Sequence, residues 1–194
     1  MNRDRRYKNK LLLVLSTLLW SSISFAQEME VPVSVQYPLF LKILTFDRNL
    51  IERTESYLTI GVVYQGKFNL SRKVKEQWVK EMHHSPIKKI QNLEIHQIEI
   101  DLDERSLSKT LQNEKINVLY ITPLRGISLQ SIVDVADSLD ICTLSGVPRY
   151  VEAGVAVGIG LKIQKPLILI NLKASKAQGM DLSSQLLKLA RIIK

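Results

Sequence analysis

The chain of 194 residues is poor in the residue types on which several classes of protein depend. Cysteine occurs once, so no disulfide can form within the chain, and the apolar neighbours of Cys142 predict a buried, unreactive thiol. The three histidines, His83, His84 and His96, lack the i, i+4 spacing of helix-borne metal sites, so we expect no metal and no other cofactor. No serine lies in a Gly-x-Ser-x-Gly elbow, and the sequence therefore predicts a protein that is not an enzyme.

Apolar runs long enough to span a membrane are also missing. The longest candidate, Leu11–Trp20, has about half of the ~20 residues that a spanning helix needs. It follows the basic segment Met1–Lys10 and precedes small residues at Ser24 and Ala26, an order typical of a cleaved secretory signal peptide. We therefore expect residues 1–26 to be a signal peptide and residues 27–194 to form one exported domain; an uncleaved membrane anchor is the alternative.

Export also changes what the charge implies. The formal net charge is +8, but the first 26 residues hold five basic residues and one acidic residue, which leaves the mature chain at +4. A mildly basic exported domain does not meet nucleic acid, so we expect no nucleic-acid partner.

Strand-like and helix-like segments alternate through the mature chain. β-branched or alternating runs predict strands, periodic runs predict helices, and a Gln-Lys-Pro turn joins the last two strands as a hairpin. The predicted fold is a single-domain α/β three-layer sandwich, with a mostly parallel sheet, an antiparallel C-terminal portion and a closing C-terminal helix. The expected strands are Tyr57–Tyr64, Leu93–Ile100, Val118–Ile121, Asp140–Leu144, Val155–Ile163 and Leu167–Leu172. The expected helices start near Gln36 (with Pro38 in the first turn), at Asn69 or Ser71, at Ser106, at Ser128 and at Tyr150.

The C-terminal segment predicts the closing helix in most detail. Apolar residues recur at helical spacing and place Leu182, Leu186, Leu189 or Ala190, and Ile193 on one buried face. Asp181 or Ser183 is a suitable N-cap, because its side chain can accept from the first free N–H groups of the helix.

Two clusters that could carry chemistry have simpler structural explanations. The acidic residues at Asp101, Asp103 and Glu104 follow a strand and precede a helix, where carboxylates favour the positive end of the helix dipole. The Gly154–Gly160 segment lacks the Lys-Ser/Thr of a phosphate loop, and its alternating Val and Ile residues predict a strand.

The segment from Ile170 to Arg191, INLKASKAQGMDLSSQLLKLAR, resembles the closing motif of the YfiR-like periplasmic proteins. Phe40–Asn49, Ile116–Ile121 and Thr143–Ser145 with Gly154 are similar to upstream family segments in the same order. The chain departs from the family at two positions. Asn117 lies near a strand position usually held by cysteine, and Val155 replaces the second glycine of a Gly-Gly pair. The resemblance therefore does not extend to disulfide-based redox sensing.

The resemblance implies a non-enzymatic periplasmic regulator. Its partner would be the periplasmic domain of an inner-membrane diguanylate cyclase or histidine kinase, with effects on cyclic-di-GMP and biofilm formation; self-association into a homodimer stays open. Apolar anchors usually carry such interfaces. We expect the partner to contact exposed apolar residues around the C-terminal segment and the loop before the hairpin, namely Val147, Tyr150, Val151, Met180, Leu182 and Leu187.

A periplasmic module that binds a small molecule or anion is the alternative hypothesis. Parallel α/β sheets bind ligands beyond the carboxyl ends of their strands. The lining would come from Gln65–Asn69, Thr122–Gly126 and Ser145–Arg149, with Arg125 and Arg149 available to pair an anion.

Overall fold

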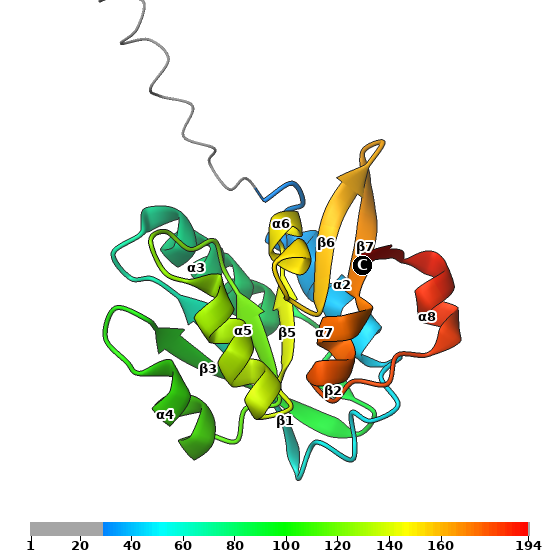
Figure 1. The fold of residues 1–194 in the computed structure, drawn as a ribbon, viewed down its shortest axis with the longest axis horizontal. Coiled ribbons are helices and arrows are strands. Elements are labelled where there is room, and N and C mark those ends of the chain that lie inside the picture. Colours follow the sequence, from blue (N-terminus) through cyan, green and yellow to red (C-terminus); the bar gives the residue numbers. More distant parts are fainter. Residues whose placement is uncertain (1–28, 194) are drawn as a thin grey trace, which may run out of the picture.

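The computed structural model describes residues 29–193, so the predicted signal peptide lies outside the described residues. One mixed sheet of eight strands lies between two layers of helices, with the strand order β2-β3-β1-β4-β5-β6-β7-β8 (Figure 1). The strands are β1 Tyr57–Tyr64, β2 Lys89–Ile90, β3 Leu93–Asp101, β4 Val118–Ile121, β5 Cys142–Ser145, β6 Val157–Lys162, β7 Lys165–Asn171 and β8 Arg191–Ile193. Strands β3, β1, β4, β5 and β6 run parallel, and β7 is antiparallel to β6, which confirms the predicted α/β fold class.

The described helices are α2 Val33–Leu44, α3 Asn69–His84, α4 Leu107–Asn113, α5 Leu129–Ser138, α6 Pro148–Glu152, α7 Leu172–Ala177 and α8 Ser184–Leu189. Helices α2 and α3 pack on one face of the sheet, and α4, α5 and α6 pack on the other (Figure 1). All four residues of β4 are buried, as expected of a parallel strand that is covered on both faces. Among residues 29–193, no helix is long and apolar enough to cross a membrane.

The starts of α2 and α6 differ from the prediction, and α6 begins at Pro148 rather than at Tyr150. Helix α2 begins at Val33, so Pro38 lies inside it; both Pro38 and Ser34 one turn earlier are exposed, so water can reach the carbonyl that proline leaves unpaired. Helix α3 begins at Asn69 as predicted but has no side-chain cap, and Ser71 instead accepts a hydrogen bond from the Gln65 amide at 2.9 Å. The predicted cap at Ser128 is confirmed by its bond to the Ser131 amide.

The C-terminal segment folds differently from the single helix that its periodicity predicts. Residues 172–177 already form α7, Gly179 turns the chain at a φ of +73°, and α8 begins after the Ser183 N-cap. Helix α8 ends at Leu189, and Arg191–Ile193 forms β8, which pairs in parallel with Leu169–Asn171 of β7. The edge of β7 offers backbone partners that a continued helix would leave unpaired, and the β-branched Ile192 and Ile193 suit a strand.

A buried ion pair ties this segment to the loop after α2. The Asp47 carboxylate is fully buried and bonds to the guanidinium of Arg53. It also accepts from the amides of Asn49 at 3.1 Å and Asp181 at 2.9 Å. Arg53 donates in turn to the Asp140 carbonyl at 3.1 Å, next to β5. The pair therefore fixes the start of the segment that leads to α8.

Candidate functional site

The crevice at the carboxyl ends of β1 and β4 is where an open α/β sheet usually binds a ligand, because the connection after β1 leads toward β3 and the connection after β4 leads the opposite way, toward β5. Gln65, at the end of β1, accepts from the Arg125 amide at 2.6 Å and donates to the Arg125 carbonyl at 3.1 Å. Below it, the hydroxyls of Ser71 and Thr122 lie 2.6 Å apart, and Thr122 donates to the Val63 carbonyl. These polar groups bond one another across the crevice.

The adjoining end of β4 and β5 is filled from the N-terminal segment. Gln36 of α2 is buried, accepts from the Tyr120 hydroxyl at 2.9 Å and donates to the Val31 carbonyl at 2.5 Å. Gly146 makes room for it, since a Cβ there would lie 2.2 Å from the Gln36 side chain. Met29 packs against the apolar clusters of both layers. The chain's own side chains thus occupy the place that the ligand-binding hypothesis assigned to a small molecule.

The acidic and histidine clusters have structural roles or lie in solvent. Asp101 accepts from the Gly66 amide at 2.9 Å, and Asp103 accepts from the Lys67 amide at 2.8 Å, so the two acids hold the loop after β1. They do not cap α4, which starts later, after Ser106. His83 and His84 are exposed at the end of α3. Within residues 29–193, no group of three potential metal ligands comes together.

The prediction that six apolar residues are exposed for a partner is wrong for five of them. Five of the six side chains are buried in the core of the sandwich: Val147, Tyr150, Val151, Met180 and Leu182. Leu187 is half-buried against the core on the α2 side, whereas Leu189, expected to be buried, is 70% exposed. The exchange follows from the short α8, because ending the helix at Leu189 lets the chain turn toward β7 and leaves this side chain outside.

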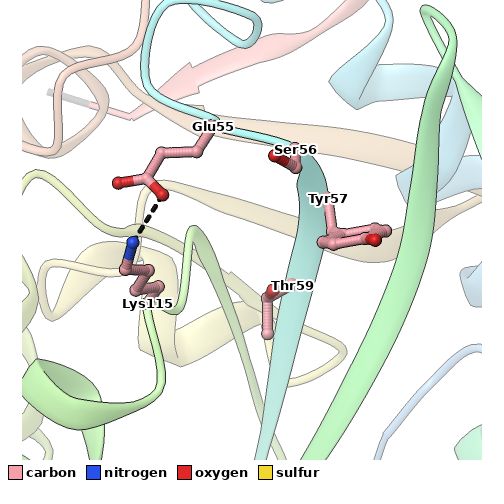
Figure 2. Close-up of a pocket in the computed structure, with 5 residues that line it drawn as sticks. All are labelled: Glu55, Ser56, Tyr57, Thr59 and Lys115. Carbon is pink, nitrogen blue, oxygen red and sulfur yellow. Dashed lines mark hydrogen bonds and ion pairs between the residues drawn. The ribbon is translucent and has the colours of Figure 1, made fainter.

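A shallow recess lies at the opposite, amino-terminal edge of the sheet. It has a volume of about 250 Å³ and is lined by Glu55, Ser56, Tyr57, Thr59 and Lys115. Figure 2 shows Glu55 and Lys115 pointing toward one another, and their ion pair of 2.5 Å is exposed. Tyr57 points away from them and stacks on His96 with ring centres 4.1 Å apart. Because its two charges neutralise each other in solvent, the recess offers little net electrostatic attraction to a ligand.

Exposed apolar side chains gather instead beside the β6–β7 hairpin, which projects from the sheet (Figure 1). Ile163 at its tip is 88% exposed, and Leu161 is 42% exposed. A groove of about 530 Å³, here named the hairpin groove, is lined by Leu161, Lys162, Leu167, Leu189, Ala190 and Arg191. Sequence periodicity missed these residues. The available signal was the turn at Ile163-Gln164, where a two-residue hairpin normally carries Asn-Gly.

Neither Cys142 nor Tyr37, two groups whose pKa is strongly shifted, lies in the crevice, the recess or the hairpin groove. Burial raises the pKa of the Cys142 thiol to about 12, so the thiol is protonated at neutral pH. Burial likewise raises the pKa of Tyr37 to about 12. Both groups belong to the core, and the predicted buried, unreactive state of Cys142 agrees with its location.

Comparison with solved structures supports the fold. The chain is similar to the ABC domain in complex with L-Trp from Streptococcus pneumonia, with a TM-score of 0.58, 13% identity, and coverage of 84% of this chain and 62% of that one. It is also similar to a conserved domain protein from Vibrio cholerae o1 biovar eltor str. n16961, with a TM-score of 0.55, 15% identity, and coverage of 84% and 60%. The chain spans about three fifths of each of these structures. At such identities the likeness concerns the fold alone.

Comparison of sequences identifies the family. No curated protein matches the chain. The family described as YfiR/HmsC-like matches residues 54–191, which include β1 to β7, α8 and the start of β8. The match contains the C-terminal segment whose motif suggested the resemblance and covers most of the chain. The protein therefore belongs to the YfiR/HmsC-like family, a family of periplasmic regulators.

Proposed function

We propose that this protein is exported through its N-terminal 26 residues and regulates an inner-membrane signalling protein from the periplasm. The partner would be the extracytoplasmic domain of a diguanylate cyclase or a histidine kinase, and the regulator would itself catalyse no reaction. Family membership supports the general role. The observation that carries the proposal is the contrast between an occupied ligand crevice and an exposed apolar groove next to the hairpin.

Regulation by binding requires different affinities for two states of the partner. A ligand shifts a two-state equilibrium only by the ratio of its affinities, so a regulator that binds the inactive state ~100-fold more tightly changes the active-to-inactive ratio up to ~100-fold. The regulator needs no moving parts for this. Its rigid sandwich, with a hydrogen-bonded crevice and a buried Asp47–Arg53 pair, suits a preformed surface.

The direct experiment measures signalling output in the native host. Deleting the gene should change cyclic-di-GMP levels and biofilm mass, or the output of one sensor kinase, by several-fold. The change should reverse with the full-length gene but not with a version that lacks residues 1–26 and stays in the cytoplasm. Crosslinking in intact cells should attach the regulator to an inner-membrane protein with a cyclase or kinase domain. Unchanged output after deletion, together with no such crosslink, would rule the proposal out.

A further inference from the structure

The hairpin tip keeps an apolar side chain in a backbone conformation that disfavours it. Ile163 and Gln164 form the two-residue turn with φ of +49° and +59°. Left-handed backbone is unusual and strained for a β-branched residue, and the favoured sequence there is Asn-Gly. Ile163 offsets none of this strain by burial, because it is 88% exposed. Strain held at an exposed apolar tip points to a contact made outside the chain.

The β7 edge that borders the hairpin groove is only partly paired. β8 pairs with Leu169–Asn171 of β7, whereas Lys165–Ile168 pairs within the described residues on the β6 side alone. In this register the Ile168 amide and the Pro166 carbonyl point away from β6, toward the groove. Pro166 adds no N–H to the edge, so the groove presents one backbone donor and one acceptor to an incoming chain.

Among residues 29–193, the charged side chains that line or flank the hairpin groove are all positive. Lys162 and Arg191 line it, Lys165 follows the hairpin turn, and Lys188 precedes the Leu189 wall. All four side chains are exposed, and none forms an ion pair with an acid among residues 29–193. The nearest acid along this hairpin, Glu30, is engaged on the far edge of β6 by the Leu161 amide at 2.8 Å. Positive charge around an apolar floor fits a ligand that is acidic and has apolar side chains.

We propose that the hairpin groove binds an extended, acidic segment of the partner protein, which lies along β7 in line with β8 as a short added strand. The inference rests on the proposed function and specifies its docking surface. Alternate side chains of the segment would contact Leu161, Leu167 and Leu189, and its carboxylates would face Lys162, Lys165 and Arg191. Strand addition takes affinity from main-chain bonds and specificity from alternate side chains.

A concave groove favours a polypeptide over a membrane surface as the occupant. The hairpin groove is a hollow that is open to solvent beside β7, so an extended chain can enter it lengthwise, whereas a flat lipid headgroup layer would touch only the projecting tip. The four free β7 residues span roughly 13 Å at ~3.3 Å per residue, which matches a strand of about four residues.

Purified mature protein can be tested against overlapping peptides that tile the extracytoplasmic domains of the host's inner-membrane diguanylate cyclases and histidine kinases. We expect binding to be confined to acidic peptides and to weaken with salt. Leu189→Asp and the double variant Lys165→Glu/Arg191→Glu should each lower affinity at least tenfold. Ile51→Asp and Lys109→Glu are matched controls on exposed residues outside the groove and should change affinity less than twofold.

A second arm tests the strand itself. A single backbone N-methyl group on the peptide residue that faces the Ile168 amide and Pro166 carbonyl should abolish binding, while N-methylation one residue away should be tolerated. Equal binding of both methylated peptides would overturn strand addition. Two other results would overturn the proposed occupant: groove-dependent binding to phosphatidylglycerol vesicles without peptide binding, or a concentration-dependent dimer that Leu189→Asp abolishes.

Signalling output separates failure of this inference from failure of the proposed function. If the wild-type gene restores output and the Leu189→Asp gene does not, both stand, provided that the variant protein accumulates and unfolds at the wild-type urea concentration. If the Leu189→Asp gene restores output fully, the groove is not the docking surface but the regulator remains. If the wild-type gene itself has no effect on output, the proposed function fails.

Discussion

Two surfaces of the molecule differ in how their polar groups are used. One is the crevice at the carboxyl ends of β1 and β4, and the other is the hairpin groove near the β8 edge of the sheet. In the crevice, Gln65, Ser71, Thr122 and Gln36 all bond to partners within the chain. In the groove, the cations have no ion-pair partner and the outer edge of Lys165–Ile168 has no strand partner among the described residues.

Hydrogen bonds inside a crevice stabilise the fold and remove the groups with which a ligand would be recognised, because each buried polar group needs one partner. An exposed edge with unpaired groups contributes little to folding and keeps them available for a partner. Our proposal therefore places recognition away from the general position of ligand sites in α/β sheets, since the fold alone does not say which polar groups are already paired.

The largest effect on stability is expected at the buried Asp47–Arg53 ion pair, which fixes the segment that leads to α8 and the groove. Asp47→Ala should lower the free energy of unfolding by roughly 3–5 kcal/mol, because Arg53 keeps a poorly solvated charge and the Asp181 amide loses its acceptor. Urea unfolding followed by circular dichroism measures this. Asp181→Ala is the control: its ion pair with Arg48 is exposed, so we expect a loss under 1 kcal/mol. Equal losses would mean that the buried pair does not fix this segment.

The hydrogen bonding of the crevice depends most on Gln65, which bonds to both backbone groups of Arg125. Gln65→Ala should cost about 1–3 kcal/mol of stability, because the buried side chain satisfies both backbone groups of Arg125. Gln130→Ala removes an exposed glutamine that bonds only to Asp134 and should cost under 0.5 kcal/mol. Partner binding should survive Gln65→Ala in stable preparations at low temperature. Specific loss of binding in that variant would place the docking surface at the crevice and reverse the comparison.

The crevice and the groove share one core, and the titration of the buried Cys142 thiol provides a measure of its stability. Burial raises the pKa of this thiol to about 12, while an unfolded thiol titrates near 8.5. The stabilising contribution of the protonated Cys142 thiol is therefore complete below pH ~8.5. It declines as pH rises toward 12, because only the unfolded chain forms the thiolate. By pH 9.5 the expected loss from this group is roughly 1 kcal/mol. Cys142→Ala should lose correspondingly less stability between pH 7.5 and 9.5; identical losses in both proteins would mean that the thiol is solvated.

The sequence predicts the sandwich well because its signals are local. Alternation in β3, the apolar run of β4 and the cap at Ser128 each determine an element without help from distant residues. Asn117, at a position where the family resemblance leads to an expectation of cysteine, illustrates what is not local: its side chain bonds to the Thr59 amide and the Arg53 carbonyl.

The exposed surface is harder to predict than the fold. Leu189 continues the helical period of Leu182 and Leu186, yet it lies outside because β8 competes for the following residues. Whether a residue belongs to the core or the surface there depends on the free edge of β7, which no pattern within residues 181–193 reveals. Val147, Tyr150 and Val151, which were expected at an interface, are core for another long-range reason: α6 packs against β5 and β6.

The smallest expected effect tests the strained tip. Replacing Ile163-Gln164 by Asn-Gly supplies the residues that this turn prefers and should raise the free energy of unfolding by about 1 kcal/mol. If the tip is maintained for partner binding, the same variant should bind acidic partner peptides several-fold more weakly and give a weaker signalling output. A stabilised protein with reduced function is what a strained contact residue predicts, since general damage to the fold would lower both quantities. Asn-Gly with unchanged binding would confine the docking surface to the groove walls at Leu167 and Leu189 and leave the exposure of Ile163 without a role.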